Sequence, residues 1–170
     1  MSEAAALHWT CRAFHQLSVT ELHDILQLRA EVFVVEQACA FQDIDGTDPQ
    51  AMHLMGYETA RPMTGSTGQL VAYARCFDAG VKFAEASIGR VITRASVRGS
   101  GLGHALMRQA RQVLVARWGE QPIRIGAQAR LKNFYGSHGF VDMQRPYLED
   151  GIDHLEMLWQ PANTTSGAHA

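Results

Sequence analysis

The chain has 170 residues, of which 46% are hydrophobic and 19% carry a charged side chain. This balance is typical of one globular domain and excludes a disordered chain. The net charge of −2, without any run rich in lysine or arginine, excludes nucleic acid as the main partner. No apolar run is long enough to cross a bilayer, so we expect no membrane partner either.

The three cysteines, Cys11, Cys39 and Cys76, lack the spacing of metal ligands and leave one thiol unpaired. The sequence therefore predicts no metal site and favours a reducing, cytoplasmic location. Residues 1–6 lack the basic and apolar regions of a signal peptide. We expect a single domain over residues 7–160, with frayed ends at residues 1–6 and 161–170.

The first elements follow from capping and periodicity. Residues 7–14 indicate a strand. Ser18 and Glu21 form a capping box, which predicts a helix over residues 19–37. The apolar stripe of this helix includes Arg29, and an arginine that faces a core needs an acidic partner or a ligand. The alternative is an arginine at the helix edge whose charged end reaches solvent.

Residues 37–50 show neither helical nor strand periodicity and contain Asp43, Asp45 and Asp48. Their spacing suggests a calcium loop, but the glycine comes too early for an EF-hand and no glutamate closes the loop. Two interpretations remain. One is an exposed acidic turn, and the other is an acidic lip that attracts a cationic amine.

The rest of the chain alternates strands with helices. We expect strands at residues 53–57, 69–77, 86–93, 123–128, from 139 onward and 155–159, a loop at 61–68, and helices at 102–118 and 129–137. In the strand over residues 86–93, Arg90 should face one side while Gly89 and Val91 face the other. This order predicts an α/β fold with a mixed sheet and helices on both faces.

A glycine-rich turn, Arg98 to His104, joins a predicted strand to a predicted helix. Unpaired N–H groups at the helix start and the helix dipole attract anions, and Arg98 adds a positive charge. A P-loop needs Gly-Lys-Ser/Thr where this chain has Gly103-His104-Ala105. The dinucleotide fingerprint needs a glycine or alanine where His104 stands. Neither motif is present.

Two motifs point to one family. Arg98, Gly101 and Gly103 fit the pattern Arg-x-x-Gly-x-Gly, and Asn133-Phe134-Tyr135 precedes Gly139-Phe140. Together they resemble the pyrophosphate loop and the Phe-Tyr segment of the GNAT acetyltransferases. The chain also resembles the ElaA-type subgroup of that family in the segments 28–37, 42–46, 72–75, 89–91, 126–128 and 150–154 and at His53.

The resemblance implies a GNAT-like acyl-CoA N-acyltransferase fold, with a mostly antiparallel sheet splayed between its fourth and fifth strands. It implies acetyl-CoA as the cofactor, with the pantetheine arm along the fourth strand and the pyrophosphate on the glycine-rich turn. The cofactor-binding residues that it implies are Val91, Ile92, Thr93, Arg98, Gly99, Ser100, Gly101, Leu102, Gly103, His104, Asn133 and Tyr135.

Acetyl transfer to an amine needs a proton donor for the leaving thiolate and a base for the amine. We assign the donor to Tyr135, since a tyrosine with a pKa of about 10 stays protonated at neutral pH; the alternative is a tyrosine that only packs beside Phe134. Glu36 is the predicted base, and the alternative is a solvated carboxylate at the helix end. His53 is a second candidate for the base, and its alternative is a purely structural histidine. The residues predicted to contact the acceptor are Arg29, Asp43, Asp45, His53, Arg75, Arg90 and Gln128.

The leading hypothesis is an N-acetyltransferase that acts on a small-molecule or protein amine by direct attack in a ternary complex. A covalent route through Cys39 or Cys76 lacks a neighbouring histidine in the sequence. Two alternatives stay open: an acyl-CoA-binding sensor without turnover, and an acyltransferase resembling the homoserine-lactone synthases. A homodimer also stays open.

Overall fold

The computed structural model describes residues 7–59 and 68–162. The predicted frayed ends and the predicted loop at 61–68 therefore lie almost entirely outside the described residues. Within these ranges, no helix is long and apolar enough to span a membrane.

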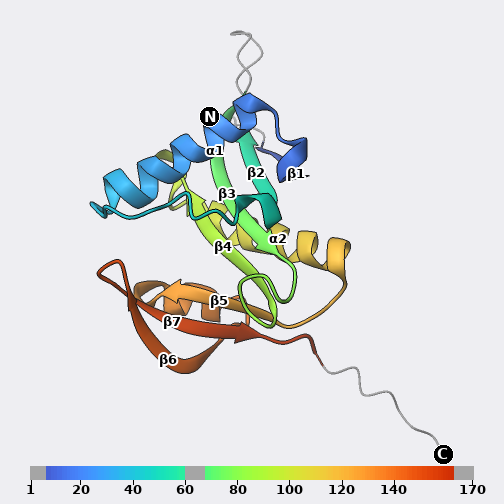
Figure 1. The fold of residues 1–170 in the computed structure, drawn as a ribbon, viewed down its shortest axis with the longest axis vertical. Coiled ribbons are helices and arrows are strands. Elements are labelled where there is room, and N and C mark those ends of the chain that lie inside the picture. The colour runs from blue at the N-terminus through green and yellow to red at the C-terminus, as the bar shows by residue number, and fades with distance from the viewer. Residues whose placement is uncertain (1–6, 60–67, 163–170) are drawn as a thin grey trace, which may run out of the picture.

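Strands and helices follow one another in the predicted order (Figure 1). The strands are β1 Leu7–Ala13, β2 Met52–Glu58, β3 Gln69–Phe77, β4 Ala86–Thr93, β5 Ile123–Gln128, β6 Val141–Glu149 and β7 Ile152–Trp159. The α-helices are α1 Val19–Arg29, α2 Leu102–Trp118 and α3 Lys132–Gly136. The helix predicted over residues 19–37 is continuous, but its second part, Ala30–Glu36, is π-helical.

The capping box predicted from Ser18 and Glu21 is confirmed as the start of α1. The Ser18 hydroxyl accepts a hydrogen bond from the Glu21 N–H at 3.1 Å, and the Glu21 carboxylate accepts one from the Ser18 N–H at 2.8 Å. Two N–H groups that the first turn leaves unpaired are satisfied in this way.

The strands form a sheet in the order β1-β2-β3-β4-β5-β7-β6. Neighbouring strands are antiparallel except β4 and β5, which are parallel and in register at only two positions, Ala86 with Ile123 and Ser87 with Arg124. Beyond these pairs the two strands diverge, and β5, β7 and β6 run at a marked angle to β2–β4 (Figure 1). The predicted splay between the fourth and fifth strands is confirmed.

The strand β4 contains a bulge next to the splay. Tyr73 of β3 faces Ile92, whereas Arg75 faces Gly89, so β4 has one extra residue between these pairs. Arg90 lies at this bulge and has a left-handed φ of 49°. The predicted strict alternation of Gly89, Arg90 and Val91 is therefore wrong, because a bulge redirects the side chains that follow it.

Helices cover both faces of the sheet, as predicted. The helix α2 buries Leu106, Ala110 and Leu114 in a cluster with residues of β3, β4, β5 and β7. On the other face, α1 and the π-helical segment bury Ile25, Leu28 and Val32 against β2, β3 and β4. The splay opens the sheet beyond Ser87 and Arg124, where the pairing of β4 with β5 ends.

Candidate active site

A cleft of about 670 Å³ occupies the splay between β4 and β5. Its walls come from the π-helical segment and the loop after it, from β3, β4 and the loop between them, from the turn before α2, from β5 and α3, and from the hairpin of β6 and β7. It therefore reaches both faces of the sheet. Residues 88–93 of β4 have no register partner in β5, so this edge of β4 faces the cleft.

The glycine-rich turn forms an anion-binding nest beside the cleft. Gly99 and Gly101 both have φ of +83°, a conformation that only glycine adopts without strain. Among the described residues, no acceptor takes a hydrogen bond from the N–H groups of residues 99–103. Successive free N–H groups at a helix N-terminus bind phosphate groups. The Ser100 hydroxyl donates to the Val97 carbonyl at 2.6 Å and holds the turn in this shape.

Arg98 pairs with Glu36, and both residues line the cleft. Its guanidinium donates to both Glu36 oxygens and also to the Thr93 carbonyl, at 2.9 Å from Nη2. The hydrogen bond from Arg98 lowers the pKa of Glu36. A carboxylate with a lowered pKa is a weaker base, so this pairing counts against the predicted catalytic role of Glu36.

Tyr135 of α3 lines the cleft with only 6% of its surface exposed. Its hydroxyl makes no hydrogen bond to any residue in the described ranges. Its ring packs edge-on against Phe134, with 5.1 Å between ring centroids. Burial raises the pKa of Tyr135 to about 12. The phenol is therefore protonated at neutral pH and can donate its proton inside the cleft.

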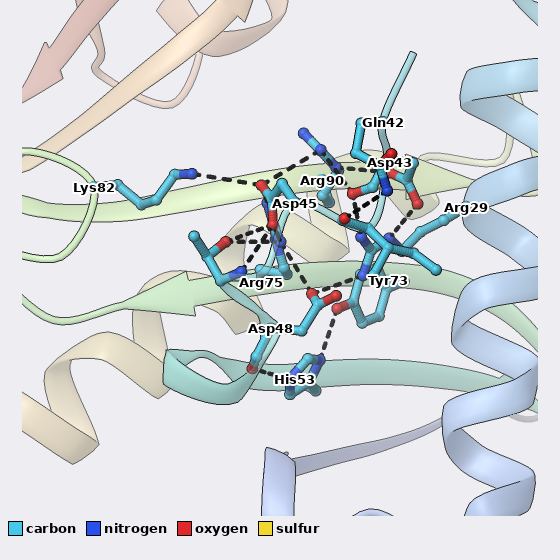
Figure 2. A network of polar contacts seen from close by, with 12 residues as sticks. Arg29, Gln42, Asp43, Asp45, Asp48, His53, Tyr73, Arg75, Lys82 and Arg90 are labelled. Carbon is cyan, nitrogen blue, oxygen red and sulfur yellow. Dashed lines mark hydrogen bonds and ion pairs between the residues drawn. The ribbon is translucent and has the colours of Figure 1, made fainter. Parts of the chain in front are cut away.

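The wall on the α1 face of the sheet is held by a network of arginine and aspartate side chains (Figure 2). Arg29 donates to Asp43 at 2.9 Å and to Asp48 at 2.7 Å. Arg75 donates to both Asp45 oxygens at 2.9 Å and to Asp48 at 3.0 Å. The network fixes the loop after the π-helical segment against β3 and β4, where Phe41, Gln42 and Asp45 line the cleft.

The predictions of an exposed acidic turn and of an acidic lip are wrong. Only 9% of Asp43 and 5% of Asp48 is exposed, and Asp45 is paired with Arg75. Arg90 and Lys82 add further positive charge next to these carboxylates (Figure 2). The charge of the three aspartates is thus neutralised inside the protein, so they cannot act as a free acidic surface.

His53 is a structural residue. Its side chain is fully buried, with Nδ1 at 2.7 Å from the Tyr73 hydroxyl and Nε2 at 2.9 Å from the Asp48 carbonyl. Burial lowers the pKa of His53 and keeps the ring neutral. It does not line the cleft, so its position gives no support to the predicted contact with the acceptor or to a role as the base.

Some of the residues predicted to bind the cofactor or the acceptor line the cleft, and others do not. Six of the predicted cofactor residues line the cleft: Val91, Ile92, Thr93, Arg98, Gly103 and Tyr135. Gly99, Ser100, Gly101, Leu102 and His104 lie in or just after the turn beside it, and Asn133 is exposed on α3 outside the lining. Of the predicted acceptor residues, Asp45, Arg75, Arg90 and Gln128 line the cleft. Arg29, Asp43 and His53 do not line it, so the cleft gives no support to the predicted acceptor contacts of these three.

The hairpin of β6 and β7 contributes four lining residues for which the sequence predicted no role: Tyr147, Glu149, Asp150 and His154. The alternation of β7 offered a signal, because Leu155 and Met157 are buried and His154 must then face the opposite side of the sheet. That this side borders the cleft follows only from the pairing of β7 with β5.

Comparisons with known proteins agree with this fold. Residues 30–161 match the model of the acetyltransferase (GNAT) domain family. Protein ElaA of Escherichia coli is 39% identical over 153 residues, which cover 89% of this chain and 95% of ElaA. The crystal structure of an acyl-CoA N-acyltransferase from Pseudomonas aeruginosa has a TM-score of 0.80 and 41% identity, covering 91% of this chain and 99% of that one. The crystal structure of E. coli ElaA also has a TM-score of 0.80, at 38% identity and with 91% and 100% coverage.

Proposed function

Because the chain belongs to the GNAT acetyltransferase family, we propose that it transfers an acetyl group from acetyl-CoA to a primary amine. The acceptor is a small molecule or a protein amine, and it attacks directly while both substrates are bound. The observation that carries the proposal is the continuity of three features: the nest of free N–H groups at residues 99–103, the unpaired edge of β4 and the buried phenol of Tyr135 all border one cleft.

The residues present fit acetyl-CoA as the donor. Its pyrophosphate needs several N–H donors in a row, which the turn at residues 99–103 offers together with the positive end of α2. Its pantetheine arm carries amide groups that can bond to the free backbone edge of β4. When bound, acetyl-CoA supplies a thioester carbonyl that is activated for attack by an amine.

The protein's own groups then have distinct tasks. A backbone N–H near Val91 or Ile92, on the edge of β4, stabilises negative charge on the carbonyl oxygen. Tyr135 donates its proton to the departing sulfur. The walls of the cleft hold the amine next to the carbonyl, which removes much of the entropic cost of bringing two molecules together.

The test combines donor binding with turnover. At about one hundred times its dissociation constant, acetyl-CoA should stabilise the folded protein by about 2.7 kcal/mol. For a chain of 170 residues this raises Tm by roughly 5–10 °C. A panel of spermidine, L-lysine and a peptide with a free N-terminus, read out by mass spectrometry, should yield at least one N-acetylated product. Binding without product from any such amine would instead support the acyl-CoA sensor.

A further inference from the structure

We propose that His154 is the general base that removes a proton from the acceptor amine, and that the acceptor enters past Glu149 and Asp150 at the β6–β7 hairpin. This proposal rests on the proposed acetyl transfer and assigns its missing proton acceptor. Glu36 and Asp45 are the other lining carboxylates across the cleft, and both are bound by arginines.

The backbone brings His154 to the edge of the splay. On β7 it is the register partner of both Gln128, the last residue of β5, and Tyr147 of β6. The β4–β5 pairing ends at Ser87 and Arg124, so the end of β5 lies where the cleft is open. His154 lines the cleft there, and its side chain is 11% exposed.

The hydrogen bonds of His154 define which ring nitrogen can accept a proton. Nδ1 lies 2.8 Å from the Ile152 carbonyl oxygen, which can only accept a hydrogen bond. Nδ1 must therefore carry a hydrogen, so in the neutral ring Nε2 holds the free lone pair. Within the described residues Nε2 has no hydrogen-bond partner, and its nearest carboxylate oxygen, Glu149 Oε2, is 3.7 Å away. This is the state that a base requires.

Packing holds the ring in place. The Tyr147 ring stacks on His154 with a centroid distance of 5.3 Å and an interplanar angle of 25°. Tyr147 reaches this position because residue 126 is glycine: a Cβ there would collide with the Tyr147 hydroxyl. Burial raises the pKa of Tyr147 to about 12, so its phenol stays neutral at neutral pH. Gly126 and Tyr147 are thus positioning residues.

The charges around His154 favour a cationic acceptor. Glu149 and Asp150 have no arginine or lysine within ion-pair distance in the described part of the chain, so their charge is available to an incoming ammonium group. Glu156, two residues along β7, is instead held by Arg124 at 2.8 Å. The cations of the cleft are Arg75, Lys82, Arg90, Arg98 and Arg130, of which Arg75, Lys82 and Arg90 are paired with aspartates and Arg98 with Glu36.

The proton and bond changes balance. The acceptor ammonium gives one proton to His154 Nε2, which later passes it to solvent, and the freed lone pair forms the N–C bond to the thioester carbon. The C–S bond then breaks and its electron pair stays on sulfur, which takes the Tyr135 proton. The second proton lost by the nitrogen replaces the one that Tyr135 gave up, directly or through water. The products are the N-acetyl amide and the free thiol.

The experiment compares the pH dependence of kcat/KM for wild type, His154→Asn and a control, His23→Asn, with the amine that gives most product in the panel. The asparagine amide can keep the hydrogen bond to the Ile152 carbonyl but cannot act as a base. We expect a loss of about 100-fold near neutral pH. The wild-type profile should show an inflection that reports protonation of the base. The variant should lack this inflection, and its rate should keep rising as the free amine becomes more abundant. His23 is 74% exposed on α1, and its variant should match the wild type.

A second variant separates a base from a structural residue. His154→Ala leaves space beside Tyr147, and added imidazole should restore part of the lost rate while leaving the acetyl-CoA thermal shift unchanged. An unchanged pH profile in His154→Asn, or no rescue of a folded, acetyl-CoA-binding His154→Ala, would overturn this assignment and leave acetyl transfer standing. Absence of product from the wild type at every pH would overturn acetyl transfer itself, and the base with it.

Discussion

Arg29 Nη1 donates a hydrogen bond to Asp48 Oδ1 at 2.7 Å, and the two side chains are 0% and 7% exposed. Asp48 accepts from Arg75 through the same oxygen at 3.0 Å. One carboxylate therefore compensates two buried guanidinium groups, and through them it joins α1, β3 and the loop that lines the cleft. This relationship makes Asp48 the residue of the network whose loss should matter most for stability.

We expect Asp48→Asn to lower the free energy of unfolding by about 3 kcal/mol, because it removes the carboxylate that two buried guanidinium groups share and leaves Arg29 only Asp43 and Arg75 only Asp45 as charged partners. Urea unfolding followed by circular dichroism measures the effect. The control is Asp142→Asn, which makes the same chemical change in the exposed pair with Lys132 and should leave the unfolding midpoint nearly unchanged. Equal effects of the two substitutions would contradict the role given to burial.

The same network should make stability depend on acid pH. Burial alone would raise the pKa of Asp45, but hydrogen bonds from Arg75 and Thr47 outweigh it and hold that pKa far below its ordinary value. A group with a lowered folded-state pKa stabilises the fold above its unfolded pKa, about 3.9 for aspartate, and loses this contribution as the pH falls toward the folded value. Asp45→Asn should therefore lower Tm at pH 7, and the gap to wild type should narrow below about pH 4. A gap that stays constant from pH 7 to pH 3 would contradict this account.

The glycine-rich turn gives a prediction about donor binding. Gly103 is a helical residue at the cleft, and a Cβ there would meet only the Phe134 ring at an ordinary distance of 3.5 Å. Gly103→Glu should therefore fold and yet repel a pyrophosphate, which abolishes the thermal shift with acetyl-CoA. Gln112→Glu adds the same charge farther along α2 and should retain the shift. Retention of the full shift in Gly103→Glu would show that the nest does not hold the donor.

Local signals in the sequence predicted the framework well. The capping box at Ser18 gave the start of α1, and the glycines at 99, 101 and 103 predicted the turn before α2. Each of these signals involves residues that are only a few positions apart, so it can be recognised without knowing how distant segments of the chain pack. The order of strands and helices followed from periodicity in the same way.

Features that depend on distant segments could not be predicted. Arg29 and Asp48 are separated by 19 residues and meet only because the intervening loop folds back over β3. The aspartates therefore looked exposed in the sequence. The bulge at Arg90 has no local signal, because a left-handed φ is unusual for arginine. His154 gains its position from the register between β7 and β5, which local patterns do not specify.

Tyr135→Phe tests the proton donor. The substitution removes only the hydroxyl, and the ring contacts with Phe134 and Phe140 can remain. We expect kcat to fall about 100-fold while the acetyl-CoA thermal shift is kept. A matched substitution, Tyr57→Phe, removes a hydroxyl from β2 outside the cleft lining and should leave kcat unchanged. A full kcat for Tyr135→Phe would show that the thiolate leaves without help from this phenol.

The cysteines should be dispensable for catalysis. Neither Cys39 nor Cys76, the two candidates for a nucleophile, borders the cleft. Cys76 is fully buried, and burial raises the pKa of its thiol, so the nucleophilic thiolate is suppressed. Cys39 donates its Sγ hydrogen to the Asp150 carbonyl at 3.3 Å. We expect Cys39→Ser to retain most of the wild-type kcat, and we expect double-reciprocal plots at several acetyl-CoA concentrations to intersect, as direct attack in a ternary complex requires. Parallel lines, together with an acetylated cysteine detected by mass spectrometry in the absence of acceptor, would replace this mechanism with a covalent one.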